Sequence, residues 1–297
     1  MRHLLNVTDL SADELELVLQ LSERTDLPPV LAGLGAALIF EKPSNRTRQS
    51  MEVAVAQLGG HPVYTRGEEV GFDVRESVED VTRVMAGYHA ILAARVFDHA
   101  VVERMASISS VPIVNMLSDY SHPLQGLADT LTMQQLHGPL AGQTIAYVGD
   151  YNNVSRSLVE ACVLLDADVM LGCPVGYHAS DAELERLNFI GGGSVRQVHR
   201  PHDAVAGAIA VHTDTWTSMG QEAEKDDRKQ AFEGYTVTEQ MMANAAANAG
   251  FYHCLPAYRG YEVAEDVIDG PHSHVIAQAH NRLHAARGAL AFLMGVR

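Results

Sequence analysis

The sequence predicts an α/β protein with two doubly wound parallel-sheet domains, and a C-terminal helix that packs back on the first domain. Apolar runs of strand length alternate with amphipathic segments of helical period, and this series occurs twice along the 297 residues. Between the two series, the stretch 137–143 (HGPLAGQ) carries two glycines and a proline, as linkers do. We therefore expect a first domain at 1–137 with the closing helix 278–297, and a second domain at 138–277.

In the first domain, each expected element follows from a local signal. The capping box SADE at 11–14 opens a helix whose apolar face begins at Leu15. The run AALIF at 36–40 is typical of a strand buried on both faces. The remaining elements are a helix with apolar residues from 51 to 58 that Gly59 ends, a helix opened by SVED (77–80) with Val81, Val84, Met85 and Tyr88 inward, strands at 89–95 and 111–117, and a helix at 122–136 with Pro123 in its first turn.

The second domain repeats the alternation. In chain order we expect a strand at 144–150, a helix from Asn153, a strand at 167–173, a helix at 181–190, a strand at 207–214, strands or extended segments at 251–256 and 274–278, and a closing helix from Gln278 to Met294. Short continuous apolar runs between helices indicate parallel strands that helices cover.

The composition excludes some classes of protein. With 21 Lys plus Arg against 37 Asp plus Glu, the formal net charge is −16, which argues against a nucleic-acid partner. The apolar runs are too short for a signal peptide or a membrane span. The three cysteines, Cys162, Cys173 and Cys254, form no CxxC pair and are odd in number, which favours reduced thiols in a cytoplasm and leaves a disulfide as the less favoured alternative.

The stretch FEKPSNRTR, residues 40–48, places two arginines and two hydroxyls directly after an expected strand. In parallel α/β sheets, ligands bind beyond the carboxyl ends of the strands, where helices begin. The N–H groups of a first helical turn, the hydroxyls of Ser44 and Thr47 and a guanidinium are all donors suited to phosphate oxygens. The stretch therefore predicts a phosphate site, whose local positive field must act against the acidic average of the chain.

A simpler interpretation of Arg46 and Arg48 is a solvated helix start, with the arginines paired to Glu41 or Glu52. The hydroxyls and the strand-to-helix junction in the same stretch favour the phosphate site. A nucleotide is a poor fit, because the sequence has no GxxxxGK[ST] and the turn at 147–153 (YVGDYNN) lacks GxGxxG.

These residues carry a resemblance to a known family. FEKPSNRTR resembles the carbamoyl-phosphate motif of the aspartate/ornithine carbamoyltransferase family. Further motifs follow in that family's order across nearly the whole chain: HPLQGLAD (122–129), GDYNN (149–153), DTWTSMGQE (214–222), HCLP (253–256) and NRLH (281–284). The DxWxSMG stretch is similar to that of the members acting on ornithine rather than on aspartate, putrescine or acetylornithine.

The resemblance implies attack of the δ-amine of L-ornithine on the carbonyl carbon of carbamoyl phosphate, giving L-citrulline and phosphate without a metal or redox cofactor. It assigns carbamoyl phosphate to Ser44, Asn45, Arg46, Thr47, Arg95, His122, Gln125, Cys254, Leu255 and Arg282, of which Arg95, His122, Gln125, Cys254 and Arg282 are the catalytic groups. Asn45 stands where the family more often has threonine, a mild change at a position that can act through its N–H. Without the resemblance, Arg95 would equally be a surface residue at a strand end, and His122 a capping or packing residue.

The pocket implied for ornithine consists of Asn153, Asp214, Ser218 and Met219. A zwitterionic amino acid needs a carboxylate for its ammonium and amide or N–H donors for its carboxylate, which are the groups of Asp214 and Asn153. The stretch 218–221 (SMGQ) is expected to act as a lid. His253 and Cys254 are adjacent on an extended segment and point to opposite faces, which disfavours a Cys–His nucleophile. The resemblance instead has Cys254 and the Leu255 carbonyl accept hydrogen bonds from the amine.

The resemblance also implies a homotrimer. The sequence departs from the family's pattern in one loop. Relatives carry a Gln or His in the loop equivalent to about 68–73, which reaches the neighbouring subunit's phosphate site. Here Gly71 lies near that place and Arg75 follows it, so either Arg75 substitutes or the contact is absent.

Three alternatives stay open. His280 and His284 are spaced to bind zinc from one helix, but no third ligand motif accompanies them. A related transferase acting on another amine, or a non-catalytic binding protein with the same fold, are the competing functions. Synthesis and breakdown of arginine would use the same residues and are not distinguished.

Overall fold

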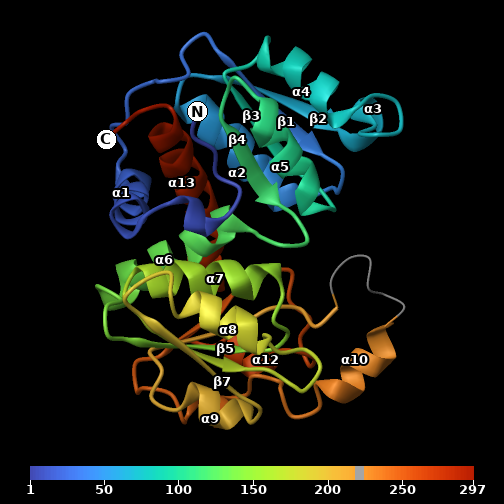
Figure 1. Ribbon diagram of the computed structural model, residues 1–297. Helices are drawn as coiled ribbons and strands as arrows, with labels where there is room; N and C mark the ends of the chain where they lie inside the picture. Colours follow the sequence, from blue (N-terminus) through green and yellow to red (C-terminus); the bar gives the residue numbers. More distant parts are fainter. Residues whose placement is uncertain (218–223) are drawn as a thin grey trace. The chain divides into compact units, whose positions relative to one another are not determined.

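The computed structural model describes residues 1–217 and 224–297, and the chain separates into two compact units. Unit 1 comprises Met1–Ala128 and His280–Arg297, and unit 2 comprises Asp129–Ala279. The divisions fall inside two helices, α6 (Pro123–His137) and α13 (Val275–Leu293). Each unit contains a parallel sheet with helices between its strands, which confirms the expected fold class (Figure 1). The domain limits placed at the linker 137–143 stay a prediction.

Unit 1 contains a four-stranded parallel sheet in the order β2-β1-β3-β4. Its strands are β1 (Gly35–Phe40), β2 (His61–Arg66), β3 (Ile91–Arg95) and β4 (Ile113–Leu117). The strand order changes direction between β1 and β3, which are neighbours in the sheet although β2 lies between them in the chain. Phe40 pairs with Arg95 at the carboxyl ends of these two strands. Such a reversal is where open α/β sheets bind ligands. The sheet therefore puts the end of the AALIF strand beside Arg95.

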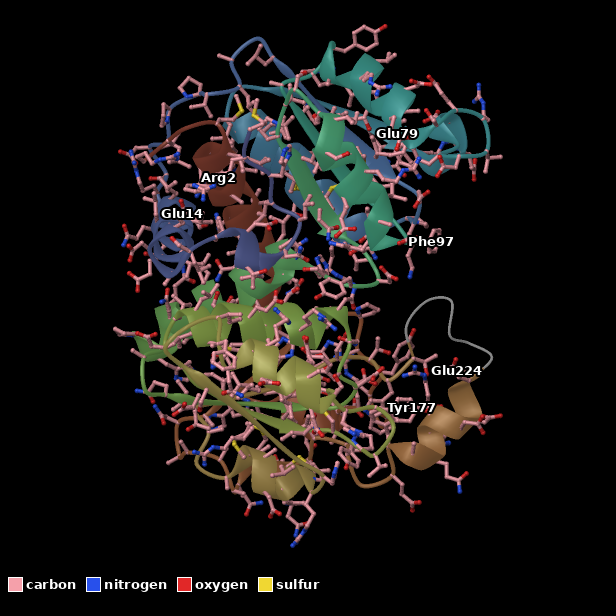
Figure 2. The ribbon with its side chains drawn as sticks, viewed as in Figure 1. Arg2, Glu14, Glu79, Phe97, Tyr177 and Glu224 are labelled. Carbon is pink, nitrogen blue, oxygen red and sulfur yellow. The ribbon has the colours of Figure 1, made fainter. Side chains whose placement is uncertain are left out.

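The helices of unit 1 begin at the signals found in the sequence. Helix α1 (Ala12–Glu23) starts with the expected capping box of Ser11 and Glu14, and the Glu14 carboxylate also pairs with Arg2 (Figure 2). The other helices are η1 (Val7–Asp9), α2 (Asn45–Gln57), α3 (Gly67–Val70), α4 (Val78–Ala86), α5 (His99–Ile108) and the unit 1 parts of α6 and α13.

One expectation for α4 is wrong. Val84 and Tyr88 were expected to point inward, yet they are 49% and 75% exposed. The buried face of α4 consists of Val78, Val81 and Thr82, and Val84 lies off this face. Tyr88 follows the end of the helix at Ala86, so helical spacing no longer governs where its side chain points.

Unit 2 contains a five-stranded parallel sheet in the order β7-β6-β5-β8-β9. Its strands are β5 (Thr144–Val148), β6 (Asp168–Gly172), β7 (Ser194–Val198), β8 (Ala210–Thr213) and β9 (Gly250–His253). The order reverses between β5 and β8, so the residues after Val148 and Thr213 lie at the ligand-binding edge of this sheet. Strand β9 lies next to β8, with His253 paired to Thr213.

The helices of unit 2 are α7 (Asn153–Leu164), α8 (Asp181–Leu187), α9 (Pro201–Val205), α10 (Lys225–Ala231), α11 (Glu239–Met242), α12 (Glu265–Ile268) and the unit 2 parts of α6 and α13. The strand or extended segment expected at 274–278 is wrong, because α13 already begins at Val275. Val275 and Gln278 are buried while Ile276 is exposed, which is the spacing of a helix face. Two β-branched residues in a short stretch gave a misleading strand signal.

Two expectations from the composition concern the whole chain. In the ranges that the structure describes, no helix has both the length and the apolar character needed to cross a membrane. All three cysteines lie in these ranges and none forms a disulfide; Cys162 and Cys173 are buried.

Candidate active site

The residues expected to bind phosphate after β1 form the first turn of α2. Ser44 is the N-cap residue, and its Oγ accepts a hydrogen bond from the Thr47 N–H (3.4 Å) and donates one to Thr47 Oγ1 (3.1 Å). Thr47 is buried, whereas the side chains of Asn45 and Arg46 are exposed. The 13-residue helix directs its positive dipole end toward this turn. The four expected residues thus share one helix N-terminus that favours an anion.

The two arginines of this stretch have different surroundings. The Arg48 guanidinium lies 3.9 Å from the centre of the Tyr64 ring, and its Nε donates to Glu52 Oε1 at 2.8 Å. The simpler interpretation, an arginine paired on its own helix, therefore holds for Arg48. Glu41 is instead used by the backbone, because its Oε2 accepts from the Phe97 N–H at 3.0 Å. Of the two arginines in this stretch, Arg46 is therefore the one for which the prediction of a phosphate contact stays open.

A second group of expected residues converges within unit 1. Arg95 at the end of β3, His122 and Gln125 at the start of α6, and Arg282 on α13 are all buried. Burial, followed by the charges of Arg282 and Arg95, holds the pKa of His122 well below its usual 6.5. Both guanidinium groups therefore act on the same imidazole, which is uncharged at neutral pH. A neutral imidazole can donate one N–H without bringing a further charge.

Hydrogen bonding joins Arg95 to the segment that leads from β1 to α2. The Glu41 N–H, one residue after β1, donates to the Arg95 carbonyl at 2.9 Å. Together with the pairing of Phe40 and Arg95, this bond fixes the two strand ends side by side. The edge of unit 1 therefore carries a helix N-terminus and a pair of buried guanidinium groups.

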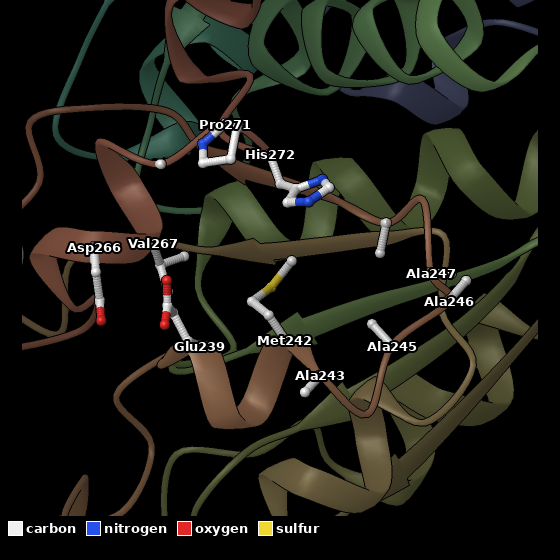
Figure 3. A pocket seen from close by; sticks show the side chains of 12 residues that line it. Glu239, Met242, Ala243, Ala245, Ala246, Ala247, Asp266, Val267, Pro271 and His272 are labelled. Carbon is white, nitrogen blue, oxygen red and sulfur yellow. The ribbon is translucent and has the colours of Figure 1, made fainter.

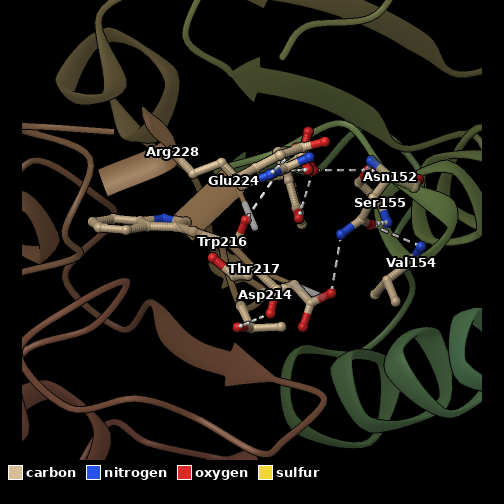
Figure 4. Close-up of polar contacts among 11 residues, drawn as sticks. Asn152, Val154, Ser155, Asp214, Trp216, Thr217, Glu224 and Arg228 are labelled. Carbon is tan, nitrogen blue, oxygen red and sulfur yellow. Dashed lines mark hydrogen bonds and ion pairs between the residues drawn. The ribbon is translucent and has the colours of Figure 1, made fainter. Parts of the chain in front are cut away.

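In unit 2, Asp214 and Cys254 lie side by side after adjacent strands. Cys254 Sγ donates to one oxygen of the Asp214 carboxylate at 3.0 Å. Asn152 Nδ2 donates to the other oxygen at 3.1 Å (Figure 4). Asp214 is buried, so these donors orient a carboxylate with little access to water. A buried and oriented carboxylate is suited to an ammonium group.

Asn152 was missed by the sequence interpretation, which chose its neighbour Asn153. Asn152 is the N-cap of α7, and its Oδ1 accepts from the N–H groups of Val154 and Ser155 while its Nδ2 reaches Asp214. Asn153 is the first residue of α7 and is half-buried. An Asn directly before a helix is a capping signal that could have identified the first role but not the second.

A buried ion pair behind Asp214 was also missed. Arg228 Nη1 donates to Asp150 Oδ2 (2.7 Å) and to the Trp216 carbonyl (3.0 Å), and its Nε donates to Glu224 Oε2 (3.0 Å) (Figure 4). Burial raises the pKa of Asp150, and the Arg228 charge opposes that rise. Arg228 thus fixes the backbone two residues after Asp214. The expected pocket residues Ser218 and Met219, and the lid stretch 218–221, lie outside the described residues.

Metal binding can be tested on the residue types present. Within the described ranges, one group of three residues brings ligand atoms within 4.8 Å of one another: Asp214, His253 and Cys254. Both His253 nitrogens already make hydrogen bonds, with the Leu255 N–H and with Glu262, and the Cys254 thiol donates to Asp214. The group is therefore satisfied by its own contacts. In the part of the chain that the structure describes, His280 and His284 belong to no such group of three.

The 68–75 loop of unit 1 holds its own arginine. Gly71 adopts a left-handed conformation (φ 59°) at the end of α3, and Arg75 Nη1 donates to the Glu69 carbonyl at 3.1 Å. The side chain of Arg75 is exposed. Its role in a neighbouring subunit stays a prediction.

Unit 2 also contains a hollow that other segments of the chain form. It has a volume of about 390 Å³ and is lined by the end of α11, the alanines that follow it, α12 and residues 270–272 (Figure 3). Five of its twelve lining residues are alanines, the carboxylates of Glu239 and Asp266 are among the others, and none is a residue assigned above.

Comparison with known proteins gives independent support. A family model for the aspartate/ornithine carbamoyltransferase carbamoyl-P binding domain matches residues 2–135, and one for the Asp/Orn binding domain matches residues 141–293. The chain is 41% identical over 304 residues to the anabolic ornithine carbamoyltransferase of Pyrococcus furiosus, covering 99% of this chain and 96% of the relative. The solved ornithine carbamoyltransferase structure from Pyrococcus furiosus superposes with a TM-score of 0.94 at 40% identity, covering 100% of this chain and 98% of that one. The structure from Thermus thermophilus gives a TM-score of 0.90 at 40% identity, covering 99% of each chain.

Proposed function

We propose how one reaction is divided between the two units, from the premise that the chain belongs to the aspartate/ornithine carbamoyltransferase family. The chain transfers the carbamoyl group of carbamoyl phosphate to the δ-amine of L-ornithine, which gives L-citrulline and phosphate. The amine nitrogen bonds to the carbonyl carbon, the bond from that carbon to the phosphate oxygen breaks with its electron pair, and the amine loses a proton.

Unit 1 holds carbamoyl phosphate in this proposal. The phosphate accepts hydrogen bonds from the first turn of α2, through the backbone at Asn45 and the side chains of Ser44, Arg46 and Thr47. Phosphate is the leaving group, so these donors also stabilise the charge that develops on it. The helix N-terminus described above supports this assignment.

The carbonyl of carbamoyl phosphate faces the buried group of unit 1. Arg95 and Arg282 stabilise the negative charge that forms on the carbonyl oxygen as the amine attacks, and neutral His122 donates an N–H to that oxygen. Gln125 shares the first turns of α6 with His122 and accepts from the carbamoyl NH2. The lowered pKa of His122 supports a donor that stays neutral throughout the working pH range.

Unit 2 holds ornithine. Asp214 takes the α-ammonium group, Asn153 donates to the carboxylate, and Ser218 and Met219 complete the pocket. Cys254 and the Leu255 carbonyl accept hydrogen bonds from the δ-amine and contact the carbamoyl group. The contact between the Cys254 thiol and Asp214 supports a common pocket for these two residues.

One observation carries the proposal: the buried guanidinium groups of Arg95 and Arg282 both act on His122, at the strand edge that also bears the α2 N-terminus. The test is citrulline formation from carbamoyl phosphate by wild type, Arg46→Ala and Arg48→Ala. Arg46→Ala should lower kcat/KM by about 100-fold, because it removes a donor to the leaving group. Arg48→Ala is the matched control, and it should change kcat/KM by no more than about threefold, since Arg48 is engaged by Tyr64 and Glu52.

A panel of amines separates the competing functions. Ornithine, putrescine and N-acetylornithine are offered at equal concentration with carbamoyl phosphate. Turnover of ornithine alone supports the proposal, and faster turnover of another amine would replace it with a related transferase. Wild-type protein that binds carbamoyl phosphate and turns over no amine would instead favour a binding protein.

We also propose that the protein is a cytoplasmic homotrimer that serves arginine biosynthesis. A closed cyclic assembly is an ordinary outcome for a soluble enzyme subunit. Light scattering of the purified protein should give three times the mass of one chain. A monomer of full activity would overturn the trimer, and with it any role of Arg75 in a neighbouring subunit.

A further inference from the structure

The backbone turns sharply directly after β9, at the residues proposed to meet the amine. Leu255 has a φ of +58°, a left-handed conformation that residues with a Cβ rarely adopt. Such a conformation is unfavourable for a non-glycine residue, because it brings the Cβ too close to the following carbonyl oxygen. It persists where surrounding contacts hold it, and it often occurs at functional sites.

The side chain of His253 holds this turn. The Leu255 N–H donates to His253 Nδ1 at 2.9 Å, which closes a short ring around Cys254. His253 Nε2 lies 3.1 Å from Glu262 Oε1, and that same oxygen accepts the Tyr258 N–H at 2.6 Å. His253 and Glu262 are both buried.

These contacts define the protonation state of the ring. Because the Leu255 N–H is a donor, His253 Nδ1 must be an acceptor and carries no proton. The ring proton therefore lies on Nε2 and is donated to Glu262. The backbone of His253 is fixed as well, since its N–H donates to Gln278 Oε1 at 2.9 Å, and Gln278 Nε2 donates to Asp129 Oδ1 at 2.6 Å.

We propose that His253 and Glu262 form a positioning pair that sets the turn presenting Cys254 and the Leu255 carbonyl to the δ-amine. The proposal rests on the function assigned above. Glu262 fixes the tautomer of His253, and the unprotonated Nδ1 then accepts from the Leu255 N–H and fixes the orientation of that peptide. Neither residue touches substrate, so both act through Cys254 and Leu255.

A purely structural role is the competing explanation, since removing one partner of a buried pair destabilises a protein whatever its function. Two substitutions of His253 separate the explanations. His253→Asn keeps an acceptor close to the position of Nδ1 and loses the contact with Glu262. His253→Gln reaches toward Glu262 with its amide NH2 and leaves the Leu255 N–H without its acceptor.

The positioning role predicts opposite orders for stability and activity. His253→Gln should have the higher Tm, because the buried Glu262 keeps a donor. His253→Asn should have the higher kcat, by about tenfold to 100-fold, because a displacement of about 1 Å at a reacting group costs that much. If kcat follows Tm across the two variants, the pair is structural and the proposal is overturned.

Two further measurements use the folded protein directly. Glu262→Gln keeps an acceptor for the His253 Nε2–H and should retain most of kcat, whereas Glu262→Leu should lose it. In protein labelled with ¹⁵N-histidine, the imidazole signals of His253 should show the Nε2–H tautomer in wild type and Glu262→Gln. An Nδ1–H tautomer in wild type would overturn the proposal even if none of the His253 variants folds.

Controls distinguish this proposal from the proposed function. Glu160 is an equally buried carboxylate of unit 2 that pairs with Arg186 at 2.7 Å, and Glu160→Gln should lower Tm while kcat stays within about twofold. Affinity for inorganic phosphate, which depends on unit 1, should be equal in all variants. Wild type without citrulline formation would end the proposed function, whereas an active wild type with the wrong order of variants would end only the positioning role.

Discussion

In unit 1 the candidate residues are cationic: Arg46 lies in the first turn of α2, and the charges of Arg95 and Arg282 help to keep His122 neutral. In unit 2 the corresponding edge presents the carboxylate of Asp214, held by an amide and a thiol. Both edges belong to parallel sheets whose strand order reverses at the site. The comparison shows that sheet topology decides where a ligand can bind, while the residue types at the edge decide its charge.

Removing a cation from unit 1 should have the largest effect on activity. Arg95→Ala should lower kcat by about 1000-fold, because a preorganised donor to the developing oxyanion is lost. Citrulline formation under saturating substrates measures this. Arg83→Ala, which removes an exposed arginine paired with Asp80 on α4, is the control and should leave kcat unchanged. A loss of less than about tenfold for Arg95→Ala would contradict its role at the carbonyl.

The anionic edge of unit 2 gives the next largest effect. Asp214→Asn should raise KM for ornithine by about 100-fold, because a buried carboxylate no longer meets the ammonium group. Affinity for inorganic phosphate should not change, since its proposed ligands lie in unit 1. Asp203→Asn, at an exposed carboxylate of α9, is the control. Equal losses of ornithine and phosphate affinity would mean that the two units do not divide the substrates.

The charge of the nucleophile predicts how the rate depends on pH. The δ-amine resembles a lysine amine with a pKa of about 10.4, so only its small neutral fraction can attack. At low ornithine, the rate should rise by about tenfold per pH unit between pH 6 and 9. His122 adds no titration in this range, because its pKa lies well below 6.5. A flat profile from pH 6 to 9 would show that deprotonation of the amine does not limit the reaction.

The smallest effect concerns stability. His122 has a depressed pKa in the folded protein, so on acidification the unfolded chain takes up a proton before the folded chain does. Stability therefore falls as the pH drops below about 6.5, by at most about 1.4 kcal/mol per pH unit for one group. His122→Gln should reduce the shift of the urea midpoint between pH 7 and 5.5, whereas His202→Gln, at an exposed histidine, should not. Identical shifts in wild type and His122→Gln would contradict the buried neutral imidazole.

The sequence predicted the strands whose apolar runs are buried on both faces and missed two that are not. Strands β2 and β7 lie at sheet edges and are half-exposed, so their sequences HPVYTR and SVRQV carry no continuous apolar run. The other edge strands are covered by chain from elsewhere: the backbone of Leu4 bonds to β4, and His272 and His274 bond to Phe251 of β9. Half-exposed edge strands therefore need the tertiary structure to be recognised.

The candidate site shows the same division between local and distant information. Ser44 and Thr47 were identified because hydroxyls at a strand-to-helix turn are a local signal. Arg228 and Asp150 are 78 residues apart, so no local pattern could pair them. Asn152 and Asn153 are identical in type, and only the geometry of the helix start distinguishes the residue that caps α7 and orients Asp214.

Trp216 is the only tryptophan of the chain, and it lies two residues after Asp214. Its ring is buried and stacks on Phe232 with centroids 5.2 Å apart, while its carbonyl accepts from Arg228. Intrinsic emission excited at the red edge of the spectrum therefore comes from unit 2 alone, without any label. Titration with amino acids should change that emission, whereas melting of unit 1 should leave it unchanged. The chain therefore carries its own optical reporter for one half of the molecule.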